Sequence, residues 1–64
     1  MTTSELKTEA MVKLEAYSKT GLRGFAQQAY DRLAAYGMSE KSIGRVEDLT
    51  PETAAELAEW LRND

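Results

Sequence analysis

Residues 22–36 read LRGFAQQAYDRLAAY and are followed by Gly37. At about 100° per residue, the apolar members of this stretch fall on one face, which is typical of an amphipathic helix. They are Leu22, Phe25, Ala26, Ala29, Tyr30, Leu33 and Tyr36. The stretch therefore predicts a helix from about Leu22 to Tyr36 that the glycine ends.

The segments on either side have helical patterns with their own start and stop signals. Residues 2–5 (TTSE) have the form of a capping box and Gly21 suits a helix C-cap, which predicts a helix over about 3–18. Residues 50–52 (TPE) combine a hydroxyl N-cap, a proline at the first helical position and an acid, which predicts a helix over about 51–62.

The stretch between the last two long helices is short. Ser39 can cap a helical turn over 40–43 that Gly44 ends, and residues 45–49 are expected to form a connector. No segment alternates strictly between apolar and polar residues, as a half-buried strand does. The sequence therefore predicts an all-α fold, a small three-helix bundle with an additional short helical turn between helices two and three, in a single helical domain over residues 1–64. The expected core is Leu6, Leu14, Leu22, Phe25, Leu33, Ile43, Leu49, Leu57 and Leu61.

The composition limits the chemistry open to this chain. None of its 64 residues is cysteine or histidine. It therefore lacks an imidazole base, a thiolate nucleophile and the usual ligands of zinc or haem. We expect a non-enzymatic protein with no cofactor and no metal site. No apolar run has the length of a membrane span or the form of a signal peptide, so the expected location is the cytoplasm, without membrane contact.

Acidic residues gather in the C-terminal half of a chain whose net charge is −3. Glu47, Asp48, Glu52, Glu56 and Glu59 lie within a stretch that contains no lysine or arginine, and they are termed the acidic ridge. The last three recur at helical spacing, opposite the apolar face of the helix over 51–62. Two interpretations remain open: a solvated surface that keeps the chain in solution, or a ridge that docks on a basic site of a partner.

Two aromatic residues, Tyr30 and Trp60, lie at the edges of the apolar helix faces. An aromatic ring at such an edge can bury its body and keep its polar tip in water. One interpretation is that both rings close the rim of the core. The other is that an exposed ring anchors an interface, because tryptophan and tyrosine are frequent at binding hot spots. Both are candidate partner-binding residues.

The opposite face of the helix over 22–36 carries small or uncharged side chains, with one exception. Gly24, Gln28, Asp31 and Ala35 repeat along this face, and only Asp31 is charged. Such a surface permits another helix to approach closely. We favour a covering helix from the same fold; the alternative is a second chain, in a homodimer or in a complex with a partner.

One loop points to nucleic acid. Residues 21–24 (GLRG) resemble the clamp loop of KH domains and, with the apolar residues that follow, a stretched helix-hairpin-helix turn. These resemblances imply phosphate contact by Lys19 and Arg23. The other interpretation is a structural helix start, where glycine permits a tight turn. Because the chain is acidic overall, direct nucleic-acid binding is the alternative hypothesis, in the form of a small binding or recombination accessory domain.

The C-terminal two thirds carry two further resemblances. Residues 36–39 (YGMS), followed by 53–61 (TAAELAEWL), resemble the loop and the apolar third helix of ubiquitin-associated domains, and are similar to helical tails of phage single-strand annealing proteins. In size, acidity and lack of catalytic residue types, the chain also resembles small phage and mobile-element inhibitors, including anti-CRISPR proteins. This implies a protein-interaction module whose partner is a protein, such as one that handles nucleic acid.

Overall fold

The computed structural model describes residues 2–63 and contains, among these residues, four α-helices, one 3-10 turn and no strand. The elements are α1 (Thr3–Thr20), α2 (Arg23–Tyr36), α3 (Glu40–Ile43), the 3-10 turn η1 (Val46–Asp48) and α4 (Pro51–Asn63). This confirms the predicted all-α fold with three long helices and one short helical turn. The 3-10 turn is an addition, because the sequence predicts only a connector there.

The ends of α1 follow the predicted signals. The Thr2 hydroxyl accepts a hydrogen bond from the Glu5 backbone N–H at 3.2 Å. Gly21 ends the helix with a φ of 72°, and its N–H donates to the Tyr17 carbonyl at 2.7 Å. Glycine suits this cap because a side chain is strained in that backbone region. The helix continues to Thr20, slightly beyond its predicted end.

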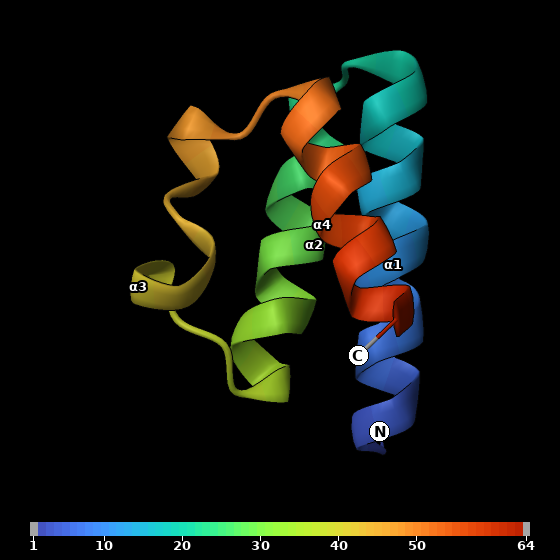
Figure 1. Cartoon of the computed structure of the whole chain (residues 1–64), viewed down its shortest axis with the longest axis vertical. Helices are drawn as coiled ribbons and strands as arrows, with labels where there is room; N and C mark the ends of the chain where they lie inside the picture. The colour runs from blue at the N-terminus through green and yellow to red at the C-terminus, as the bar shows by residue number, and fades with distance from the viewer. Residues whose placement is uncertain (1, 64) are drawn as a thin grey trace.

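α1 is the central helix of the bundle. It packs along both α2 and α4, which run in the same direction as each other and opposite to α1 (Figure 1). The chain must therefore return from the end of α2 to the level where α2 began before α4 can start. Residues 37–50 make this crossover, and α3 and η1 lie within it beside α2 (Figure 1). The crossover, together with α4, forms the walls of the site described below.

The core consists mainly of leucines and alanines from the three long helices. The buried residues are Ala10, Leu14, Tyr17, Ala26, Ala29, Tyr30, Leu33, Leu49, Ala54, Ala58 and Leu61. Alanines at helix contacts let the backbones approach closely, which explains how so short a chain encloses a core. Of the other predicted core residues, Phe25, Ile43 and Leu57 are partly buried and pack against this cluster, and Leu6 is partly buried.

Leu22 is the one predicted core residue that the structure places outside. Its side chain is 60% exposed. Leu22 is the N-cap of α2, with an extended backbone (φ −80°, ψ 115°), and the helix begins at Arg23. The helix thus begins one residue after its approximate predicted start. The predicted place of Leu22 in the core is wrong, because Leu22 precedes the first helical residue and its extended backbone departs from the helical projection.

The back face of α2 is not covered by a helix of the same chain within residues 2–63. Gly24, Gln28, Asp31 and Ala35 are all exposed. The favoured interpretation, an internal covering helix, is therefore wrong. The apolar face of α2 packs on α1, and the crossover passes only beside Asp31. An interface with a second chain at this face remains a prediction.

Candidate functional site

Side chains of the bundle hold the crossover in place by hydrogen bonds to its main-chain carbonyls. The Arg23 guanidinium donates to the Val46 carbonyl at 2.6 Å and to the Leu49 carbonyl at 2.9 Å. It also donates to the Tyr17 hydroxyl at 2.9 Å and lies over that ring, 5.7 Å from its centroid. The Tyr17 hydroxyl donates to the same Leu49 carbonyl at 3.0 Å. These contacts fix η1 and Leu49 against the junction of α1 and α2.

Tyr30 holds the crossover further upstream. Its hydroxyl lies 3.1 Å from the carbonyl oxygens of both Ile43 and Gly44, while its ring is buried against the core. Burial, followed by repulsion from Glu40 and Asp48, raises the pKa of the Tyr30 hydroxyl above its ordinary value of 10.0. Tyr30 therefore supports the site from within and does not offer the exposed ring that an interface anchor needs.

Replacing Tyr30 with phenylalanine is expected to lower the free energy of unfolding by about 1 kcal/mol at neutral pH, because the Ile43 and Gly44 carbonyls lose the single O–H donor that they share. The substitution should also make the free energy of unfolding less sensitive to alkaline pH. A phenol whose pKa is higher in the folded chain contributes stability that is complete below about pH 10 and is lost as the pH rises through the folded pKa.

Urea unfolding at several pH values between about 8 and 11 tests both effects. The free energy of unfolding of the unmodified chain should fall above about pH 10, and the fall should be smaller in Tyr30→Phe. Tyr36→Phe is the matched control and should keep the original slope, because it leaves Tyr30 in place. Equal slopes in the unmodified chain and Tyr30→Phe would contradict the prediction.

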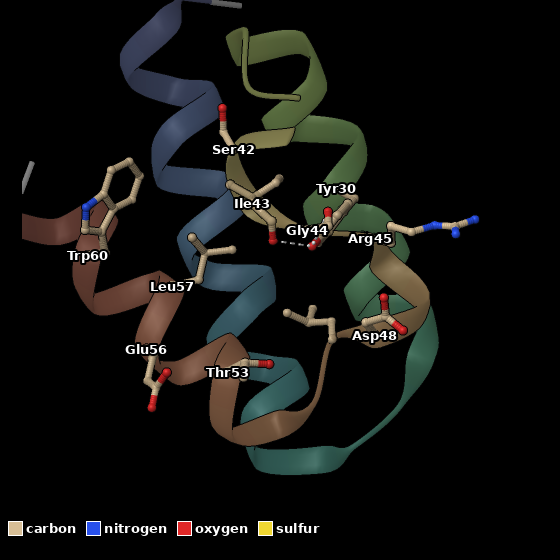
Figure 2. A pocket seen from close by; sticks show the side chains of 11 residues that line it. Tyr30, Ser42, Ile43, Gly44, Arg45, Asp48, Thr53, Glu56, Leu57 and Trp60 are labelled. Carbon is tan, nitrogen blue, oxygen red and sulfur yellow. Dashed lines mark hydrogen bonds between the residues drawn. The ribbon is translucent and has the colours of Figure 1, made fainter. Parts of the chain in front are cut away.

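A groove of about 510 Å³ lies between the crossover and α4. It is lined by Tyr30, Ser42, Ile43, Gly44, Arg45, Asp48, Leu49, Thr53, Glu56, Leu57 and Trp60, and is termed the α4 groove. Figure 2 shows Thr53, Glu56, Leu57 and Trp60 along α4 on one side and the crossover residues on the other. Its volume falls within the range of about 300–1,000 Å³ that is typical of binding pockets.

The charges around the α4 groove are acidic on balance. Among the described residues, Arg45 is the only cation in its lining. Its guanidinium pairs with Glu47 at 3.2 Å and extends away from the groove (Figure 2). Asp48 and Glu56 therefore remain on the rim without an ion pair among the described residues. The rim presents two uncompensated carboxylates beside apolar side chains.

The rest of the acidic ridge is exposed on the outer surface. Glu52 and Glu59 lie on the solvent side of α4 and form no ion pair within residues 2–63. The nearest arginine along α4, Arg62, pairs with Glu15 of α1 instead. Arg32 of α2 likewise pairs with a glutamate of α1. Arg32 and Arg62 are therefore paired with glutamates of α1, and the glutamates of the ridge on α4 have no ion-pair partner among the described residues.

Trp60 is the exposed aromatic residue of the site. Its side chain is 52% exposed and lies at one end of the α4 groove (Figure 2). The structure thus brings together four residues singled out from the sequence, with Asp48, Glu56 and Trp60 on the rim of one groove and Tyr30 in its lining. Glu47, Glu52 and Glu59 flank this groove without lining it.

The sequence alone gives no reason to assign the other residues that line the α4 groove to a functional site. Thr53 and Leu57 look like an N-terminal polar residue and a core leucine of α4, and Ile43 looks like an isolated apolar residue in a short turn. The available signal is spacing, because positions 53, 56, 57 and 60 lie on one helix face. This spacing indicates a binding site only once the crossover is known to face these four positions of α4.

The two residues that the sequence suggests for phosphate contact, Lys19 and Arg23, lie in different environments. Lys19 is exposed in the last turn of α1. Arg23 directs both terminal guanidinium nitrogens to carbonyl and hydroxyl oxygens of the protein itself. Contact between Arg23 and a phosphate would therefore compete with three internal hydrogen bonds, and the structure offers no specific support for a nucleic-acid site here.

Within residues 2–63, no group of three or more acidic side chains is arranged to hold a metal ion. In the same range, no helix is both long enough and apolar enough to pass through a lipid bilayer. Comparisons of the chain with models of protein families, with curated proteins and with solved structures find no match.

Proposed function

We propose that this chain is a non-enzymatic protein-interaction module that docks its acidic ridge on a basic site of a partner protein. In this role it would act in the cytoplasm in the manner of small phage or mobile-element inhibitors, such as anti-CRISPR proteins. A partner that normally binds nucleic acid has the positive surface that such a ridge would occupy.

One observation supports this proposal above the others. Glu52, Glu56 and Glu59 are exposed along one edge of α4 and have no ion-pair partner in the described chain, while Trp60 stands exposed beside them. Carboxylates that lack internal partners can attract a basic surface at long range. An exposed tryptophan supplies apolar contact that slows the dissociation of such a complex.

Paired capture experiments test this proposal. The unmodified chain and the variant Glu52→Lys/Glu59→Lys are used as baits in an extract of the native host, and each protein retained by the unmodified bait is purified and tested for direct binding. We expect a basic partner whose binding weakens with salt. The ridge variant should bind it at least about tenfold more weakly, equivalent to about 1.4 kcal/mol.

The variant Glu5→Lys/Glu40→Lys is a matched control, because it makes the same change in net charge on exposed residues outside the ridge. Glu40 lies in the first turn of a helix, as Glu52 does, so the two variants also share the loss of a favourable dipole contact. Equal weakening by both variants, or a purified partner that binds the ridge variant normally, would refute the proposal.

A further inference from the structure

We infer that the α4 groove binds a basic amphipathic helix of the partner, with apolar side chains in the groove and lysines or arginines on its acidic rim. This inference rests on the proposed function and names the chemistry of the partner segment.

The apolar part of the argument is the lining of the groove. Leu57 and Ile43 are partly buried and Trp60 is 52% exposed, so each has apolar surface left uncovered by the chain itself. Removing such surface from water is favourable. An occupant that presents bulky aliphatic side chains would therefore be stabilised.

The shape of the groove favours a helix. Its lining residues on α4 are Thr53, Glu56, Leu57 and Trp60, which follow the i, i+3, i+4, i+7 spacing of one helix face. They extend over about 10 Å, at about 1.5 Å per residue. A second helix laid along this face would present its own side chains at the same spacing, as in other helix-in-groove complexes. No strand within residues 2–63 offers an edge to an extended peptide.

The charge of the rim selects a basic occupant. Asp48 and Glu56 have no ion-pair partner in the described chain. Arg45, the only cation that residues 2–63 place in the lining, is paired with Glu47. Lysines or arginines that flank the apolar face of a helix would meet these two carboxylates. A second copy of this chain fits less well, because a symmetric contact through α4 would bring Glu56 and its neighbours against their own copies.

A synthetic peptide of about 18 residues tests the inference, because about five helical turns exceed the length of the groove. It carries leucines on one helical face and lysines elsewhere, and it contains no tryptophan. Trp60 is the single tryptophan of the chain, so its fluorescence reports directly on the groove. We expect a saturable shift of its emission to shorter wavelength and weaker quenching by acrylamide.

Two control peptides separate charge from shape. One has the same composition with its leucines scattered around the helix, and the other replaces every lysine with glutamate. Neither should shift the emission of Trp60. Among protein variants, Asp48→Lys/Glu56→Lys should weaken binding of the amphipathic peptide about tenfold, or about 1.4 kcal/mol, whereas Glu5→Lys/Glu40→Lys should leave it unchanged.

The possible failures can be told apart. If the scattered peptide binds as well as the amphipathic one and the emission of Trp60 does not shift, the ridge acts without the groove, and the inference is overturned while the proposed function stands. If no basic peptide changes the emission, the inference is also overturned. If the emission shifts with protein concentration alone and sedimentation shows a dimer, a second copy fills the groove. The proposed function is decided separately, by the capture experiment.

Discussion

Replacing Leu14 with alanine is expected to lower the free energy of unfolding by about 2–5 kcal/mol. Leu14 is fully buried in α1, the helix that packs against both α2 and α4. The substitution removes its methyl groups and leaves a cavity that rigid helix contacts cannot fill. A chain of this length has a total stability of only about 3–10 kcal/mol, so this single change consumes much of it.

Thermal and urea unfolding followed by circular dichroism measure this loss. For a domain of this size, about 1 kcal/mol corresponds to a change in Tm of about 4–8 °C, so Tm should fall by at least about 8 °C. Val12→Ala is the matched control, because Val12 lies on the same helix and is 57% exposed. Its effect should stay within about 0.5 kcal/mol. Similar effects of the two substitutions would contradict the assignment of α1 as the central helix.

The helices could be predicted from the sequence because their signals are local. Thr2 and Glu5 form the predicted N-cap hydrogen bond, and Gly37 ends α2 with a φ of 114°. At the start of α4, the Thr53 N–H donates to the Thr50 hydroxyl, as the predicted cap requires. Each signal involves residues within a few positions of one another, so no knowledge of the tertiary structure is needed.

The placement of Leu22 and the groove could not be predicted, because both depend on contacts outside a helix. The apolar pattern assigns Leu22 to the core, yet its N-cap position turns it into solvent. The sequence predicts both rim residues as part of the acidic ridge, Glu56 on the last helix and Asp48 just before it, but it does not show that the crossover forms the wall opposite α4. The hydrogen bonds that position this wall end on main-chain carbonyls, which every residue carries and no sequence pattern distinguishes.

Arg23→Ala is expected to lower the free energy of unfolding by about 1.5–3 kcal/mol, the range for hydrogen bonds that involve a charged group. The lower part of this range is favoured because Arg23 is itself exposed. The substitution leaves the Val46 carbonyl without its arginine donor, while the Leu49 carbonyl keeps the Tyr17 hydroxyl. Arg23→Lys should recover only part of the loss, because one ammonium cannot reproduce the planar fork that reaches both carbonyls.

The effect of Arg23→Ala should be concentrated in the crossover. Amide hydrogen exchange measured by NMR is expected to accelerate at Asp48 and Leu49, whose N–H groups donate within the turn that Arg23 holds. Amides in the middle of α1 should accelerate only as far as the global stability falls. Unaltered exchange at Asp48 and Leu49 would contradict the structural role of Arg23. If the expected pattern is found, the arginine that the sequence suggested for phosphate contact instead holds one wall of the α4 groove, and its loss should also weaken the groove's binding of a basic helix.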